Sequence, residues 1–165
     1  VPVEQFGTVE KALKIADQYD MLIFDGAPHS TAATRAIALA SGLTVIPTGL
    51  AVDDLQPAVT LAHDLAKSGV ARERIAFALC RVGNSPAEID DAREYLGKAG
   101  YAILPGALPE QVAYRRASDE GRALTETRFT SLKQRAEEMA QGMVDMISSI
   151  EADDKPKAQK KRSVA

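Results

Sequence analysis

The chain has 165 residues, 45% hydrophobic and 26% charged, a composition typical of a folded globular domain and not of a fibre or a disordered segment. Aromatic residues make up only 5%, so the core must be aliphatic, which disfavours an aromatic-rich β-sandwich. Lys and Arg number 20 against 23 Asp and Glu, a net charge of −3, so nucleic-acid binding would require a local basic patch.

The cysteine content and the hydropathy of the chain indicate its cellular compartment. Cys80 is the only cysteine, which excludes an intramolecular disulfide and a cysteine-built zinc site and fits a reducing environment. No apolar run approaches the roughly 18 residues of a membrane helix, and the first residues do not resemble a signal peptide. We therefore expect a cytoplasmic protein with no membrane partner.

Strand-like apolar runs alternate with helical periodicity along the chain. The predicted strands are 21–25, 43–47, 74–80 and 101–104. The predicted helices run from Thr8 to about Tyr19, from Ser30 or Thr31 to Ala40, from Asp53 to Gly69, from Ser85 to Gly100 and from Thr125 to Ile150.

Several local signals set these boundaries. Ser85 and Glu88 match a capping box with Pro86 at the first helical position. Gly69 and Gly100 stand where helices need a left-handed stop. Residues 151–165 carry five basic and three acidic side chains without apolar periodicity, so we expect a disordered basic tail after a domain spanning residues 1–150.

Strands alternating with helices predict an α/β fold with a parallel sheet and helices on both faces. Ligands of such sheets bind at the carboxyl ends of the strands. The segments that follow the predicted strands are 25–30, 47–54, 80–84 and 105–114.

Asp25 is the first candidate for chemistry, because it ends an apolar run and precedes Gly26, where the backbone leaves room for a ligand. A carboxylate in that position can hold Mg²⁺ beside the phosphates of a nucleotide. The alternative is that Asp25 only caps the loop or the next helix.

Residues 19–28, YDMLIFDGAP, resemble the Walker B segment of the ParA/MinD superfamily of deviant Walker ATPases. Further segments agree in order: Ile46-Pro47 followed by Asp54-Leu55, then 78–82, then 103–105 continuing to Leu124. The resemblance covers about residues 1–150 and is closest to ParA-type plasmid and chromosome partition proteins and to VirC1-like relatives that serve conjugal transfer.

This resemblance implies a three-layer Rossmann-like P-loop NTPase fold and a partition ATPase that uses ATP and Mg²⁺. It implies an ATP-dependent homodimer, non-specific binding to nucleoid DNA, and a ParB-like centromere-binding activator. Carried over by position, Asp25 is the catalytic and Mg²⁺-side carboxylate. The residues carried over to the nucleotide are Gly26, Pro28, Cys80, Arg81, Pro105, Gly106 and Leu108.

Two departures from the family pattern matter. Cys80 stands where the family usually has the asparagine that reads adenine, and a thiol is a poor substitute for an amide. No G-x-x-x-x-G-K-[ST] sequence occurs, so the chain lacks the Walker A cradle for the triphosphate. We expect the missing N-terminal part, about 60 residues in two βα units, to precede Val1, to come from another chain, or to be lost in an inactive relative.

Basic residues cluster before and within the last helix, where the family places its DNA-binding patch. They are Arg115, Arg116, Arg122, Arg128, Lys133 and Arg135. Such a stripe neutralises phosphates without reading sequence. The alternative is a solvated face balanced by nearby acids at 119, 120, 126, 137 and 138, and the basic tail is a further candidate for DNA contact.

We expect different roles for the two histidines. His63 lies near an apolar helix face, where a partly buried structural role is favoured over a ligand role, whereas His29 follows the Walker B-like run and could contact a phosphate. Rival functions are a non-catalytic adaptor or dimerisation module with this fold and a MinD-like septum regulator. The latter usually ends in an amphipathic membrane helix, for which residues 151–165 have too few apolar side chains.

Overall fold

The computed structural model describes residues 3–26 and 31–162. Its strands are β1 (Thr44–Thr48), β2 (Ile75–Val82), β3 (Ala102–Ile103) and β4 (Leu108–Pro109). Its α-helices are α1 (Val9–Leu13), α2 (Ala32–Ala40), α3 (Val52–Lys67), α4 (Pro86–Gly97), α5 (Val112–Asp119) and α6 (Thr130–Arg162). Short 3-10 turns span Ala16–Gln18, Arg72–Arg74 and Leu124–Glu126.

The sheet is parallel, in the order β1-β2-β3. Thr44 of β1 pairs with Ile75, and Phe77 pairs with Ile103 of β3. The chain then returns to β2 at β4, where Leu108 pairs in parallel with Cys80. The predicted α/β class with a mainly parallel sheet is confirmed, and the arrangement is compatible with a Rossmann-like fold.

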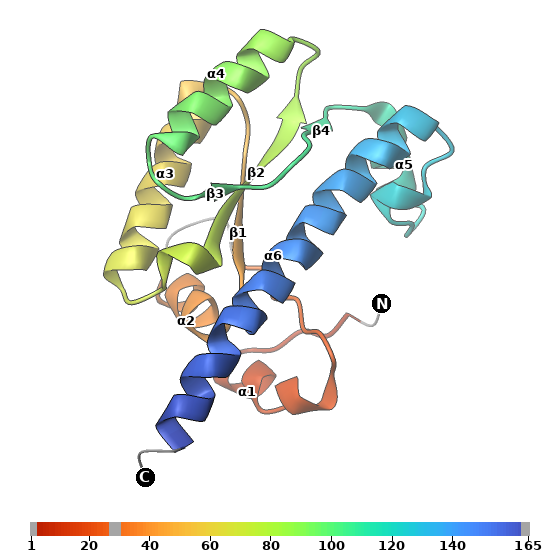
Figure 1. Cartoon of the computed structure of the whole chain (residues 1–165). Helices are drawn as coiled ribbons and strands as arrows, with labels where there is room; N and C mark the ends of the chain where they lie inside the picture. Colours follow the sequence, from red (N-terminus) through yellow and green to blue (C-terminus); the bar gives the residue numbers. More distant parts are fainter. Residues whose placement is uncertain (1–2, 27–30, 163–165) are drawn as a thin grey trace.

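Strand β2 divides the core into two clusters. Ile75, Phe77 and Leu79 are fully buried and pack in one cluster with α3 and α4, which lie side by side (Figure 1). The alternate residues Ala76 and Ala78 face a second cluster that contains methionines of α6. Because side chains alternate across a strand, α3 and α4 cover one face of the sheet and α6 covers the other.

The two faces of β2 differ in side-chain size. The bulky side of β2 meets both alanines and leucines of α3, including Ala62 and Leu65, whereas its alanine side meets Met139 and Met143 of α6. On the α6 side, small strand residues thus leave room for large helix residues. Of the apolar residues predicted to line the last helix, Met139 and Met143 therefore dock on the sheet.

A glycine brings α6 close to the end of β3. A Cβ atom on Gly142 would lie 2.4 Å from the Cδ and Cγ atoms of Pro105, so only glycine allows this approach. Gly142 is buried, and Pro105 begins the connection from β3 to β4. The helix and the connection therefore fix each other's position.

Most predicted boundary signals are present. One half of the predicted capping box forms, in which the Ser85 side chain accepts a hydrogen bond from the Glu88 amide at 3.4 Å, and Pro86 opens α4. Gly69 and Gly100 have φ values of 105° and 76°, the left-handed conformation predicted for them. The reciprocal capping box forms at Thr31 with Thr34, at the start of α2.

The prediction of a strand at residues 21–25 is wrong. These residues form no strand in the structure, and Met21 and Ile23 are 59% and 80% exposed. A strand requires a paired neighbour, and within the described residues the backbone pairs of β1 are all with β2. An apolar run predicts burial, but it does not supply the partner strand.

Two helix ends also differ from expectation. The first helix ends at Leu13 and not near Tyr19, with a 3-10 turn following. At the other terminus α6 continues past Ile150 to Arg162, where a disordered tail was expected. Asp154 accepts a hydrogen bond from Arg74 at 2.5 Å, an ion pair that apolar periodicity cannot reveal.

Replacing Gly142 with alanine tests the close approach of α6. We expect Gly142→Ala to lower the free energy of unfolding by about 1–3 kcal/mol, because the new methyl group overlaps Pro105 and the helix must shift. Chemical denaturation measures the change.

The matched control is Gly97→Ala at the end of α4, where a Cβ atom would meet nothing within 4 Å. This control should be neutral or stabilising by up to about 1 kcal/mol, since alanine favours helix. The double variant Gly142→Ala/Pro105→Ala should recover stability. If Gly142→Ala is as harmless as Gly97→Ala, the packing account is wrong.

Candidate functional site

Three segments meet at the carboxyl end of β2, the place where parallel sheets bind ligands. They are the residues after β1, the end of β2, and the connection from β3 to β4. Leu104 donates to the Phe77 carbonyl at 2.8 Å, and Glu110 donates to the Val82 carbonyl at 3.1 Å, so this connection runs along β2. We call this region the β2 edge.

The β2 edge contains five of the residues assigned to the nucleotide. Cys80 and Arg81 end β2, and Leu108 is the register partner of Cys80. Pro105 and Gly106 lie in the adjoining connection between β3 and β4. The structure thus brings these five together, although their sequence separation reaches almost thirty residues.

Arg81 has a left-handed backbone, with φ of 56°, and is the one non-glycine residue with positive φ within the described ranges. The register of β2 shifts here, so that Val82 joins the cluster under α3 and α4 while Arg81 is exposed. Such an extra residue redirects a strand end and is frequent beside functional sites. The Arg81 guanidinium lies 4.0 Å from the Asp54 carboxylate, a largely solvated pair of little energetic weight.

Arg93 of α4 holds the connection after β3. Its guanidinium donates to the carbonyls of Leu104 at 3.3 Å and Gly106 at 2.5 Å. Gly106 needs its left-handed φ of 72° for this turn. Sequence reasoning missed Arg93, but one signal was present: it lies four residues after Ile89 and three before Leu96, on the apolar face of its helix.

The Cys80 thiol is half-buried and packs toward α6. It adjoins the cluster that contains Met139, and this burial raises the pKa of Cys80, partly offset by the charge of Arg81. The neutral thiol therefore predominates at physiological pH and acts mainly as a small apolar group.

The β2 edge does not fit a triphosphate by itself. The helix that follows β1 carries Asp53 and Asp54 in its first turn, and a Cβ atom on Gly49 would lie 2.2 Å from the Asp54 Oδ2 atom. Two carboxylates therefore occupy the helix N-terminus that could otherwise attract phosphate. The residues at this edge can border a nucleoside, but they provide no phosphate cradle.

The Walker B-like residues are not brought to this edge by any contact within the described residues. Asp25 is exposed, and a Cβ atom on Gly26 would lie 4.0 Å from Cδ1 of Ile37 in α2. Pro28 and His29 lie outside the described residues. Nor do any three His, Cys, Asp or Glu side chains of residues 3–26 and 31–162 form a metal-binding group.

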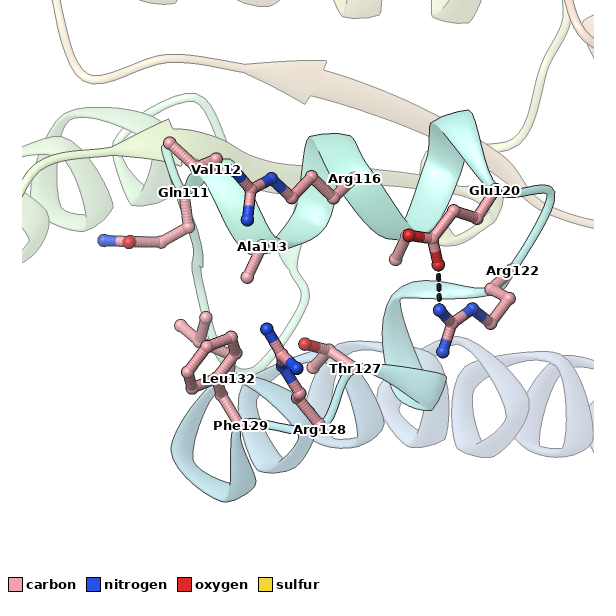
Figure 2. A pocket seen from close by; sticks show the side chains of 11 residues that line it. Gln111, Val112, Ala113, Arg116, Glu120, Arg122, Thr127, Arg128, Phe129 and Leu132 are labelled. Atoms are coloured by element: carbon pink, nitrogen blue, oxygen red, sulfur yellow. Dashed lines mark hydrogen bonds and ion pairs between the residues drawn. The ribbon is translucent and has the colours of Figure 1, made fainter.

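A second candidate site is a cavity of about 450 Å³ between α5 and the start of α6, which we call the α5–α6 pocket (Figure 2). Its lining combines cationic and apolar side chains. Those that bear on its chemistry are Arg116, Arg122, Arg128, Val112, Phe129 and Leu132. Three of the six residues predicted to bind DNA therefore line one cavity.

The predicted basic stripe is partly neutralised. Three of its members form ion pairs with neighbouring acids: Arg115 with Glu110, Arg122 with Glu120, and Lys133 with Glu137 at 3.6 Å. Within the described part of the chain, Arg116, Arg128 and Arg135 form no ion pair. The alternative of a balanced face thus holds for half of the stripe only.

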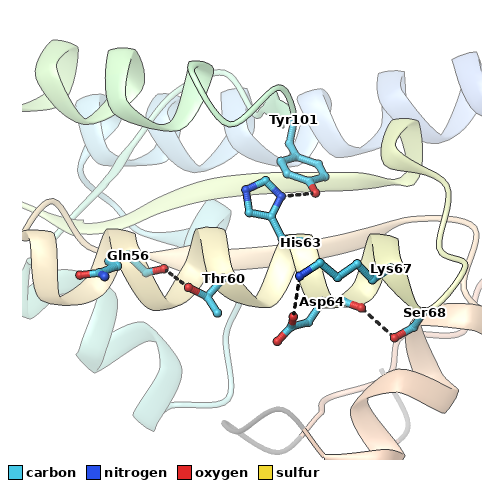
Figure 3. Close-up of polar contacts among 7 residues, drawn as sticks. All are labelled: Gln56, Thr60, His63, Asp64, Lys67, Ser68 and Tyr101. Atoms are coloured by element: carbon cyan, nitrogen blue, oxygen red, sulfur yellow. Dashed lines mark hydrogen bonds and ion pairs between the residues drawn. The ribbon is translucent and has the colours of Figure 1, made fainter.

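His63 connects α3 to the start of β3. Its Nδ1 atom lies 2.9 Å from the Tyr101 hydroxyl (Figure 3), and the Arg72 guanidinium lies 4.8 Å from the centre of the Tyr101 ring. His63 is partly buried, as its place near an apolar helix face predicts. We assign this cluster to packing between α3 and β3.

Comparison with known proteins leaves the identity of the chain open. No protein-family model matches the sequence, and no curated protein sequence matches it either. Among the helices that the structure describes, none combines the length and apolar character needed to cross a membrane.

Substitutions at Arg81 test whether its backbone is strained. We expect Arg81→Gly to be about 1 kcal/mol more stable to unfolding than Arg81→Ala, because only glycine adopts positive φ without a steric penalty. Urea denaturation of both variants measures the difference.

Lys133 in the interior of α6 provides the control, because both of its variants lose the same ion pair with Glu137. There the order should reverse, with Lys133→Gly less stable than Lys133→Ala by up to about 1 kcal/mol. An identical order at both positions contradicts the strain at Arg81.

Proposed function

We propose that this chain is part of a ParA-type partition ATPase, which dimerises on ATP, binds DNA non-specifically and segregates plasmid or chromosomal DNA. The observation that carries the proposal is the gathering of Cys80, Arg81, Pro105, Gly106 and Leu108 at the β2 edge. These positions come from two separate stretches of the resemblance, and they lie where parallel sheets bind ligands.

In this proposal the β2 edge borders the nucleoside. Asp25 would be the one carboxylate of this chain to hold Mg²⁺, with the remaining ligands from the phosphates and water, and the bound ion would supply positive charge beside the phosphates. Arg93 positions the 104–106 carbonyls and thereby the loop along the base. The phosphate cradle must come from residues other than those of this sequence, in the same protein or in another chain.

DNA binding rests on the cations that remain unpaired. Arg116, Arg128 and Arg135 keep a local positive charge on a chain whose net charge is −3, and phosphate contact requires only such a patch. The proposed partners are a second copy of the chain, nucleoid DNA and a ParB-like activator. MinD-like and conjugal-transfer ATPases are variants of the same proposal.

One observation favours a second candidate, a non-catalytic adaptor with the same fold. Asp53 and Asp54 place negative charge at the helix N-terminus of the β2 edge, where a nucleotide-binding protein needs positive potential. An adaptor would retain the sheet for dimerisation and the basic residues around the α5–α6 pocket for DNA binding, without hydrolysing ATP.

The decisive experiment measures ATP hydrolysis by the complete product of the reading frame that encodes these residues. We expect Mg²⁺-dependent turnover that Asp25→Asn lowers by about 100-fold, since removing the metal-side carboxylate costs several kcal/mol of transition-state stabilisation. Asp17→Asn, in the exposed 3-10 turn after α1, is the matched control and should leave turnover unchanged.

Residues 1–165 alone should show no turnover. DNA binding by the complete product without any ATP hydrolysis would replace the ATPase with the adaptor. Mg²⁺-dependent hydrolysis by residues 1–165 alone would contradict the requirement for an external phosphate cradle.

A further inference from the structure

The α5–α6 pocket is lined by two cations that form no ion pair. Arg116 projects from α5 and Arg128 from the segment before α6; in Figure 2 the Arg128 side chain points into the gap and the Arg116 side chain lies along α5. Neither forms an ion pair within the described residues. Arg122, at one end of the pocket, is held by Glu120. Two guanidinium groups are thus available to an anion between the helices.

The hydroxyl group of Thr127 accompanies these cations. Thr127 is only 8% exposed and lines the pocket, and its side chain makes no hydrogen bond within the described part of the chain. Its oxygen is still accessible from the pocket, because Thr44 Oγ1 is the one fully buried side-chain polar atom without a partner among the described residues. A ligand oxygen in the pocket can therefore accept a hydrogen bond from Thr127.

The other end of the pocket is apolar. Val112 and Phe129 are 52% and 50% exposed, and they lie with Leu132 beside the cations (Figure 2). The Arg128 guanidinium lies 5.5 Å from the centre of the Phe129 ring, so the charged and apolar parts adjoin. A complementary ligand has an anionic group and a flat apolar group next to each other.

We propose that the α5–α6 pocket binds a phosphorylated small molecule that carries a planar apolar group. The phosphate lies between Arg116 and Arg128 and accepts a hydrogen bond from Thr127, since guanidinium forks match phosphate oxygens. The planar group rests on Phe129 and Leu132. The cavity of about 450 Å³ has the size of a small-ligand site.

The hollow shape favours a compact ligand over a DNA duplex at Arg116 and Arg128, so we reassign these two residues from DNA to the small molecule and leave Arg135 to DNA. A duplex contacts cations along an exposed surface, whereas Thr127 is 8% exposed and lines the pocket between α5 and α6. The pocket therefore goes beyond the proposed ATPase. Ligand binding in this pocket requires neither ATP nor the β2 edge.

The test uses phenyl phosphate as the probe, because it has the required charge and ring but no nucleobase that the β2 edge could bind. Titration of the ¹⁵N-labelled chain, followed by amide NMR shifts, should show shifts confined to residues 112–132. Phenyl phosphate should bind more tightly than inorganic phosphate or phenol. Equal binding of phenol and phenyl phosphate would overturn the phosphate site, and shifts spread over the chain would overturn the pocket.

Three variants sharpen the test. Arg128→Gln should weaken phenyl phosphate binding about tenfold or more, and Thr127→Val about fivefold, from the loss of hydrogen bonds to the phosphate. Arg115→Gln is the matched control, because Arg115 pairs with Glu110 and does not line the pocket. If all three variants bind alike, the proposal is wrong. Because Arg128 is exposed, Arg128→Gln should fold, and its binding result tests the proposal even if Thr127→Val does not fold.

A competition arm identifies the source of the phosphate. A short DNA duplex that displaces phenyl phosphate with the same dependence on Arg128 would overturn the small-molecule assignment and give the pocket to the DNA backbone. Retention of phenyl phosphate in the presence of duplex supports a free phosphorylated ligand.

Discussion

The alternation of large and small side chains along β2 is the constraint on which the other elements depend. Ile75, Phe77 and Leu79 pack against the buried alanines and leucines of α3 and α4, while Ala76 and Ala78 leave room for the methionines of α6. A shift of β2 by one residue would exchange the two faces and place bulky side chains against α6. The register of this one strand therefore determines which helices lie on which side.

The same constraint positions the candidate site. The left-handed backbone of Arg81 ends the alternation and redirects the strand at its carboxyl end. Gly142 allows α6 to approach Pro105, and Arg93 holds the carbonyls around Gly106 from the opposite layer. The loop beside β2 is thus fixed from both faces of the sheet, as a ligand-binding edge requires.

Much of the fold could be predicted from short-range signals. Ser85 with Pro86 marks a helix start, Gly69 and Gly100 mark helix ends, and the spaced methionines of α6 mark a buried face, because each signal acts within a few residues. The prediction of a strand at residues 21–25 is wrong, because a strand depends on a distant partner.

The candidate site was predictable only in part. Cys80, Arg81 and Leu108 could be grouped from the rule that ligands bind at the carboxyl ends of parallel strands. Arg93 acts through carbonyls eleven and thirteen residues away, Asp154 pairs with Arg74 across eighty residues, and Thr127 becomes informative only once its burial is known. Such contacts depend on tertiary packing, which no local pattern encodes.

The central claim is that the β2 edge is the side of the sheet that faces the nucleotide. Photo-crosslinking of the complete product with 8-azido-ATP, followed by peptide mapping, tests it most directly. The account predicts labelled peptides that contain residues 80–82 or 105–108. Labelling confined to the α5–α6 pocket, or to the opposite ends of the strands, would contradict it.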